Sequence, residues 1–327
     1  MDWTAPLPAR RSASAPACAG TMPPMTLKVG AVMPIAGEGG RPAPRWNEIR
    51  EVAAAAETSG LDSIWVYDHL LFRSDGATEG IHESWTLLAA LAALTRRVEI
   101  GELVLAMPFR NPALLAKMAA TADEVAGGRL ILGIGCGWHE PEFDAFGFPF
   151  DHRVARFEEA LEILVPLLRG TDEVTVAGRY HRAERAVVLP RSPVRPDGRA
   201  AIPLLIAGKG PRMLSLVARH ADAWNTAWLG TVEDLAPRLA PLRAAMDAAG
   251  RDLASLEITV GVNVVIPELT TPGDEPPARA ISGSLDELAE GIRGYAEAGV
   301  GHLVCAVTPS TPAAMARLAK AARRSRE

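Results

Sequence analysis

The stretch "IPLLIAGKGPRMLSLVARHADAWN", Ile202–Asn225, contains one complete unit of strand, helix and strand. An apolar run at Pro203–Ala207 leads through a glycine-rich turn into a helix predicted to begin at Pro211, and a second apolar run follows at Ala221–Asn225. Because one helix returns the chain to the starting edge of the sheet, the two strands must lie parallel. This unit predicts a parallel α/β sheet.

The same alternation recurs along the rest of the chain. The runs predicted to form strands are Leu27–Met33, Ser63–Tyr67, Val98–Leu105, Leu130–Ile134, Pro203–Ala207, Ala221–Asn225, Leu256–Val265 and His302–Val307. The helices are predicted to begin near Arg45, Glu83, Pro112, Arg153, Pro211, Val232, Leu285 and Thr311. A sheet of this many units can close, so we predict an α/β fold, the (β/α)8 TIM barrel, over an open doubly wound sheet. The loops after the strands then carry the chemistry.

The chain of 327 residues has the length of a single α/β barrel. Residues 1–25 are predicted to be a disordered N-terminal tail, and residues 26–327 a single barrel domain. Met25 directly precedes the first strand and is a candidate for the natural start.

Three connections are longer than an ordinary turn: Trp138–His152, Thr171–Ile202 and Pro267–Ser284. We therefore expect insertions in the loops after strands four and seven. The middle connection contains "VTVAGRYHR", a predicted hairpin with its turn at Ala177–Gly178. We expect this hairpin to cap the mouth of the barrel.

Composition excludes several classes of function. A formal net charge of −5, with no basic run, argues against binding nucleic acid. Cys18, Cys136 and Cys305 are too few for a disulfide framework or a zinc site, which favours the reducing cytoplasm and no metal. No run approaches about 18 apolar residues, so we expect no membrane span. A small-molecule substrate is the expected partner.

The first candidate site is the turn Gly208–Arg212. Its glycines let the backbone approach a ligand closely, and the first N–H groups of the following helix favour an anion. Lys209 and Arg212 add positive charge. The pattern is typical of a phosphate-binding turn, and equally of an ordinary glycine-rich connection between a strand and a helix.

Asp68 and His69 form a second candidate, because they follow the second strand and so fall on the rim where barrels place their chemistry. Histidine is suited to proton transfer near neutral pH, and an adjacent carboxylate can orient its ring. The alternative is a helix-capping aspartate beside a structural histidine.

Gly133, Gly135 and Gly137 end the fourth strand and leave room for a flat ligand. Their spacing lacks the third glycine of a dinucleotide fingerprint. Cys136 is more typical of a small buried residue than of a nucleophile. Glu102 places a charge within an apolar strand, where it is either paired with a helix or functional. The residues predicted to pack in the core are Trp65, Trp85, Trp224 and Trp228.

Four segments, in order, resemble the F420-dependent oxidoreductase branch of the luciferase-like monooxygenase superfamily. They are "DHLL" from Asp68, "RNPALLAKMAATADEVAGGRLILGIGCGW" from Arg110, "EFDAFGFPFDHRVARFEEALEIL" from Glu142, and "PLLIAGKGPRMLSLVARHADAWN" from Pro203. The resemblance runs from about Leu27 to the C-terminal helix. It implies a TIM barrel, the fold that the alternation also predicts.

Members of this superfamily use either reduced FMN with oxygen or coenzyme F420, a deazaflavin that carries hydride. The FMN-type luciferases tend to have Glu-His-His after strand two, whereas Asp68-His69 resembles the pair in F420-dependent dehydrogenases. The resemblance therefore implies coenzyme F420, with FMN as the alternative.

The resemblance also implies which residues would hold the cofactor. Its phosphate would be held by Ala207, Gly208, Lys209, Gly210, Pro211 and Arg212. Glu102 and Leu103 would lie on a bulge of strand three that supports the deazaflavin ring and often contains a non-prolyl cis peptide bond. Cys136 and His139 would border the cofactor.

Catalysis is implied for His69, which would act on the substrate hydroxyl or carbonyl, while Asp68 would orient it or touch the cofactor. The leading hypothesis is hydride transfer between F420 and a small carbonyl, alkene or imine. One alternative is a monooxygenase that uses reduced FMN from a separate reductase, and another is a non-catalytic protein that binds the cofactor. Relatives commonly form homodimers.

Overall fold

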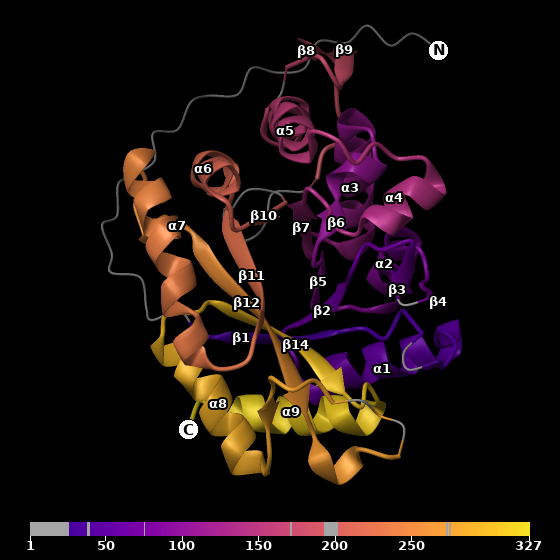
Figure 1. Ribbon diagram of the computed structural model, residues 1–327, viewed down its shortest axis with the longest axis vertical. Helices are drawn as coiled ribbons and strands as arrows, with labels where there is room; N and C mark the ends of the chain where they lie inside the picture. Colours follow the sequence, from indigo (N-terminus) through magenta and orange to yellow (C-terminus); the bar gives the residue numbers. More distant parts are fainter. Residues whose placement is uncertain are drawn as a thin grey trace, which may run out of the picture.

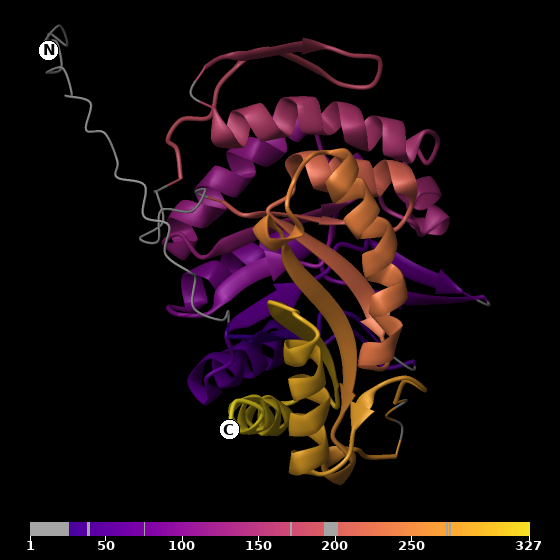
Figure 2. The same cartoon turned by 90° about the vertical axis from the view of Figure 1, so that its left-hand side faces the viewer.

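Figure 1 shows the computed structural model, which describes residues 26–37, 40–74, 76–170, 172–192, 202–272, 274 and 276–327. The predicted tail, residues 1–25, lies outside the described residues. Parallel strands form the centre of the molecule, and helices surround them (Figures 1 and 2).

The strands close into a barrel in the order β10–β11–β12–β14–β1–β2–β5–β7, and β7 pairs again with β10. Their bounds are β1 (Lys28–Val32), β2 (Ser63–Val66), β5 (Glu99–Glu102), β7 (Leu130–Gly135), β10 (Leu204–Ala207), β11 (Ala223–Leu229), β12 (Glu257–Val265) and β14 (His302–Thr308). Leu205 pairs with Ala223 on one side and with Gly133 on the other, which closes the ring. The predicted barrel is confirmed, and the open sheet is wrong.

Most helices begin within one residue of the predicted starts, and side chains of the expected types cap several of them; a 3-10 turn (Val232–Asp234) takes the place of the start predicted at Val232, and α4 was not predicted. They are α1 (Trp46–Ser59), α2 (Ser84–Leu94), α3 (Pro112–Ala126), α4 (Glu140–Phe146), α5 (Arg153–Arg169), α6 (Pro211–His220), α7 (Ala236–Ala248), α8 (Leu285–Glu297) and α9 (Pro312–Arg324). Asn111 accepts hydrogen bonds from the first free N–H groups of α3, and Ser284 forms a capping box with Glu287 on α8.

Trp65 fills the closed end of the barrel, as predicted for a packing residue. A Cβ at Gly101 would lie 2.3 Å from the Trp65 ring, so the neighbouring strand can carry only glycine there. The Trp65 Nε1–H donates to Ser63 Oγ at 2.7 Å, and Ser63 Oγ lies 2.6 Å from His302 Nε2. Ser63 and His302 are buried at the first residues of β2 and β14, opposite the rim.

Strand three is interrupted, as the resemblance implied. Regular pairing stops at Glu102 and resumes in the short strand β6 (Leu105–Ala106), and the peptide bond between Leu103 and Val104 is cis. The two residues between these strands point their side chains toward the rim cavity described below.

Insertions lie in the predicted loops, and one more follows strand two. The loop after β7 carries α4, and the loop after β12 carries a 3-10 turn (Pro267–Leu269) and the short strand β13 (Ile281–Ser282). A hairpin of β3 (Leu71–Ser74) and β4 (Ala77–Gly80) was not predicted.

The predicted hairpin of the middle connection forms, but it does not cap the barrel. Strands β8 (Val174–Ala177) and β9 (Arg182–Ala186) lie on the outer side of α5 (Figure 2), and the turn spans four residues. Glu159 on α5 accepts the backbone N–H groups of Arg179 and Tyr180 at 2.8 and 2.7 Å, which fastens the turn to the helix. None of the described residues 172–192 lines the rim cavity.

The helices within the described part of the chain include none that is long and apolar enough to cross a membrane.

Candidate active site

A cavity of about 580 Å³ opens at the C-terminal ends of the barrel strands. It is lined by Val32, Tyr67, Asp68, His69, Phe72, Leu103, Val104, Leu105, Ala106, Gly135, Cys136, Gly137, Trp138, Glu142, Ala207, Gly208, Lys209, Asn225, Thr226, Ala227, Trp228 and Ala306. Most of this surface is apolar, with a few polar groups, which is the usual character of a small-molecule site.

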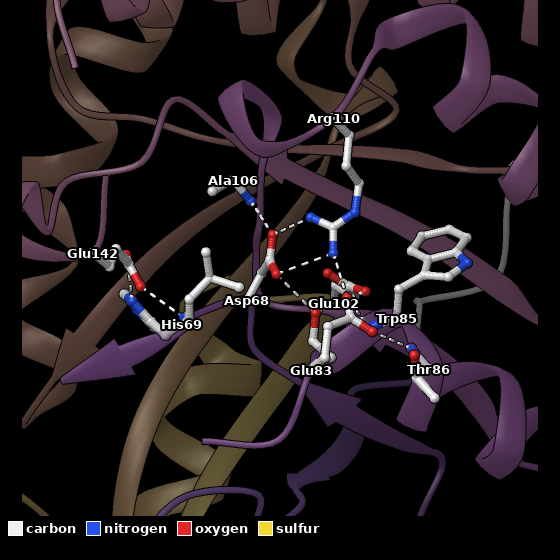
Figure 3. Close-up of polar contacts among 11 residues, drawn as sticks. Asp68, His69, Glu83, Trp85, Thr86, Glu102, Ala106, Arg110 and Glu142 are labelled. Carbon is white, nitrogen blue, oxygen red and sulfur yellow. Dashed lines mark hydrogen bonds and ion pairs between the residues drawn. The ribbon is translucent and has the colours of Figure 1, made fainter. Parts of the chain in front are cut away.

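His69 is oriented by a carboxylate that the sequence did not indicate. Its Nδ1 lies 2.9 Å from Glu142 Oε1, and the other oxygen of Glu142 accepts the Leu70 N–H at 2.8 Å (Figure 3). A carboxylate accepts hydrogen bonds, so this pair assigns the Nδ1 proton to His69 and leaves Nε2 for other partners. Glu142 is buried on α4 and is therefore held firmly.

Asp68 does not orient His69, because its side chain points the other way (Figure 3). Its carboxylate binds both terminal nitrogens of Arg110, at 2.5 and 3.2 Å, and accepts the Ala106 N–H at 2.9 Å and the Ser84 hydroxyl at 3.0 Å. It does not cap a helix either. Asp68 instead ties β2 to the backbone that follows the strand-three bulge.

Glu102 lies behind this cluster and does not line the cavity. Glu102 ends β5, and its buried side chain faces the start of α2, where the Ser84 hydroxyl is 3.4 Å from its Oε1. Its Oε2 has no hydrogen-bond partner among the described residues. Burial, and then the neighbouring Asp68 carboxylate, raises the pKa of Glu102 well above its ordinary value. Glu102 therefore fits the alternative in which it faces a helix, and burial favours its protonated form.

The lining of the cavity is apolar where the bulge meets β7. Leu103 and Val104 contribute to it together with Gly135, and a Cβ at Gly135 would lie 2.8 Å from Val104 Cγ2. The glycine therefore leaves room for the Val104 side chain against β7, and no side chain of residue 135 intrudes on a planar ring bound there. The residues present fit a flavin-type ring system.

The glycine-rich turn is divided between the cavity and the surface. Ala207, Gly208 and Lys209 line the cavity, whereas Gly210, Pro211 and Arg212 do not. Arg212 forms an ion pair with Glu158 on α5, with its Nη2 2.6 Å from Oε2. The free N–H groups at the start of α6 and the Lys209 ammonium therefore remain the features that fit an anionic tail.

Of the two residues predicted to border the cofactor, Cys136 lines the cavity and His139 does not. Burial raises the pKa of the Cys136 thiol, so the reactive thiolate is disfavoured. The Nε2 of His139 accepts the Arg73 N–H at 3.1 Å. His139 thus joins the β3–β4 hairpin to the segment before α4.

Glu142, Arg110, Phe72 and Trp138 were missed by sequence reasoning. Nothing local separates Glu142 from its neighbour Glu140, since the contact that distinguishes it is made with His69, 73 residues away. Trp228, predicted to pack in the core, is 44% exposed and lines the cavity, so that prediction is wrong. It lies at the rim end of β11, where packing neighbours are few.

No group of three or more His, Cys, Asp or Glu side chains that could hold a metal ion occurs among the residues that the structure describes.

Comparisons with known proteins agree with this architecture. The chain is 35% identical over 227 residues to the phthiodiolone/phenolphthiodiolone dimycocerosates ketoreductase of Mycobacterium tuberculosis, covering 63% of this chain and 58% of the relative. It is 32% identical to the F420-dependent glucose-6-phosphate dehydrogenase of Amycolatopsis mediterranei, covering 66% and 64%. The match therefore spans less than two thirds of these relatives.

Among solved structures, an F420-dependent secondary alcohol dehydrogenase in complex with an F420-acetone adduct has a TM-score of 0.74 at 19% identity. The likeness covers 93% of this chain and 100% of that chain, and it shows a shared fold. A family model described as luciferase-like monooxygenase matches residues 25–271. The chain therefore belongs to the luciferase-like monooxygenase family.

Proposed function

We propose that this protein is an F420-dependent oxidoreductase that transfers hydride between the deazaflavin and a small organic substrate, a carbonyl, alkene or imine. The observation that carries the proposal is the His69–Glu142 pair, which presents one ring nitrogen toward a largely apolar cavity at the rim. Two relatives support the cofactor and the reaction, since one is named an F420-dependent dehydrogenase and the other a ketoreductase.

Two parts of the cavity lining support binding of this cofactor. The bulge at Leu103 and Val104, with Gly135, would support the ring, and the turn at Gly208 and Lys209 would hold the phosphate. When bound, coenzyme F420 supplies or accepts the hydride. The protein must then provide the proton and the orientation of the substrate.

His69 is the residue placed to move that proton. In reduction of a carbonyl, protonated His69 donates from Nε2 to the substrate oxygen as negative charge develops there. In the opposite direction, neutral His69 accepts the hydroxyl proton at the same nitrogen. Glu142 stabilises the charged ring and holds its orientation in both directions.

Asp68 and Arg110 are positioning residues in this proposal. Asp68 is buried and Arg110 largely so, and Asp68 also accepts the Ala106 N–H, so we expect the pair to keep the bulge in the shape that supports the ring. Removing one partner of a buried pair leaves an unpaired charge, which typically costs about 3–5 kcal/mol.

Cofactor binding tests the proposal. The purified protein is titrated with F420 and, separately, with FMN, and quenching of cofactor fluorescence is followed. We expect saturable F420 binding, and oxidation of reduced F420 when a substrate is added. Binding of FMN alone, with oxygen consumption in the presence of a flavin reductase, would instead establish the monooxygenase. F420 binding without turnover by the wild type would indicate a non-catalytic protein.

We also propose that the protein is a cytoplasmic homodimer. The outer face of α3 exposes Leu114 and Val125, and the nearby segment after β9 exposes Val187 and Leu189. Lys117 on α3 donates to the Leu189 carbonyl, which joins this segment to the helix. A surface of this kind is typical of subunit interfaces. Light scattering coupled to size exclusion measures the subunit number directly.

A further inference from the structure

Aromatic side chains from two insertions stand beside His69. The ring centre of Phe72, on β3, is 4.4 Å from that of His69, and the ring centre of Trp138, after β7, is 5.5 Å from it. The centres of Phe72 and Trp138 are 6.4 Å apart, and both side chains line the cavity. The proposed proton donor therefore lies against two large hydrocarbon surfaces that face the same cavity.

Trp138 is unusually exposed for a residue that lines a site. Its side chain is 65% exposed, although a tryptophan gains more than most residues from leaving water. A bound molecule with an apolar body would cover this surface and remove it from water. Covering the exposed indole would therefore add favourable free energy to the binding of such a ligand.

Two hydrogen bonds between backbone N–H groups and side chains join the segments that carry the aromatic residues. The N–H of Leu70 donates to Glu142 at 2.8 Å, and the N–H of Arg73 donates to His139 at 3.1 Å. These bonds join the β3–β4 hairpin to the segment that contains Trp138. Ordering these two segments in advance reduces the entropy that binding would otherwise lose.

No lysine or arginine side chain lines the part of the cavity beside His69 in the described structure, because Arg110 is bound to Asp68 behind it. Lys209 is the only lysine or arginine lining the cavity, and it follows β10, three strands around the barrel from β2. The side chain of Arg73 runs along its own hairpin to Thr78. The acids at this end are already bound, Asp68 by Arg110 and Glu142 by His69.

We infer that Phe72 and Trp138 form an aromatic clamp that selects uncharged carbonyl substrates with an apolar body and discriminates against phosphorylated or carboxylated ones. The inference rests on the proposed function, because it places the carbonyl oxygen at His69 Nε2 and the apolar body against the clamp. An anionic group in this position would lose its hydration without meeting a lysine or arginine, and the ring of His69 is already paired with the Glu142 carboxylate, so binding it costs free energy.

A matched pair of ketones tests the selectivity. Acetophenone and phenylglyoxylate share a phenyl ketone and differ by a methyl group against a carboxylate. Calorimetric titration into the F420-loaded protein should give a Kd for acetophenone at least about tenfold lower. Equal or tighter binding of phenylglyoxylate, or no binding of acetophenone, overturns the inference.

Two variants test the residues. Phe72→Ala and Trp138→Ala should each raise the Kd and the KM for acetophenone about tenfold, with a much smaller change in kcat. Phe146→Ala is the matched control, because Phe146 is 53% exposed on α4 and does not line the cavity. Clamp variants that bind acetophenone as this control does would refute the role of the two residues.

Cofactor fluorescence separates this inference from the proposed function. We expect all three variants to quench F420 as the wild type does. A wild type that fails to bind F420 contradicts the proposed function itself. A wild type that binds F420 and transfers hydride, but prefers phenylglyoxylate, contradicts only the aromatic clamp.

Discussion

His69 and His302 lie at opposite ends of the same barrel, in opposite surroundings. His302 begins β14 at the closed end, fully buried, with its Nε2 2.6 Å from the Ser63 hydroxyl. Burial, with a smaller contribution from Lys28, lowers the pKa of His302 to about 3. His69 follows β2 at the open end, lines the cavity and pairs with Glu142.

The difference shows that a histidine can act on a substrate only when one of its ring nitrogens is left free and faces the cavity. At the closed end, Ser63 Oγ accepts the Trp65 N–H and lies 2.6 Å from His302 Nε2, and burial keeps that ring neutral. No partner for His302 Nδ1 exists among the described residues. At the open end, Glu142 accepts a hydrogen bond from His69 Nδ1–H, which leaves Nε2 free to act on a substrate.

The largest effect should come from removing the open-end histidine. His69→Ala should lower kcat/KM by about 10²–10⁴-fold, because the proton donor is lost, while the Kd for F420 stays unchanged. Steady-state oxidation of reduced F420 measures the loss. His220→Ala, at the end of α6 and outside the cavity lining, should retain wild-type rates. Equal rates in the two variants would contradict a catalytic role for His69.

The closed-end histidine should instead show itself in stability at low pH. The folded protein resists protonating His302, whereas the unfolded chain binds a proton near pH 6.5. The unfolded state therefore binds more protons between about pH 6.5 and 3, and stability falls as the pH falls through this window, by on the order of 5 kcal/mol in total.

Urea unfolding of wild type and His302→Gln at several pH values isolates this contribution. The unfolding free energy of the wild type minus that of the variant should fall by about 1.4 kcal/mol for each pH unit below 6.5. Curves that stay parallel from pH 7 to 4 would show that His302 does not titrate with unfolding.

Ser63→Ala should weaken the closed end without touching the chemistry. The change leaves the buried Trp65 N–H and His302 Nε2 without their shared partner, which should cost about 1–3 kcal/mol of unfolding free energy. Ser215→Ala, exposed on α6, should change stability very little. The kcat of folded Ser63→Ala should match that of the wild type. A large fall in kcat would contradict the claim that the closed end contributes only to stability.

The smallest effect is expected for Glu142→Gln, which sharpens the role of orientation at the open end. The amide oxygen can still accept the hydrogen bond from His69 Nδ1–H. The NH₂ group then faces the Leu70 N–H, and the side chain carries no charge. We expect kcat to fall about tenfold with F420 binding unchanged. Glu140→Gln, exposed on the same helix, is the control, and equal kcat values for both variants would exclude orientation by Glu142.

Local patterns predicted the framework well and the placement of loops less well. The strands, the helix starts and the buried Glu102 followed from apolar periodicity and capping residues. The hairpin at Ala177–Gly178 was recognised as a hairpin but wrongly placed over the mouth. Its position depends on Glu159 of α5, and no local signal distinguishes this acid from other surface acids.

The sequence by itself determined the alternation of strand and helix, the turn at Gly208, and the rim position of Asp68 and His69, because these depend on residues close together in the chain. Only the tertiary structure decided which carboxylate serves which partner. Asp68 turned to Arg110 and His69 to Glu142, and Ser63 met His302 across 239 residues. Such pairs form only when the barrel closes and brings distant strands to a common end, which periodicity cannot reveal.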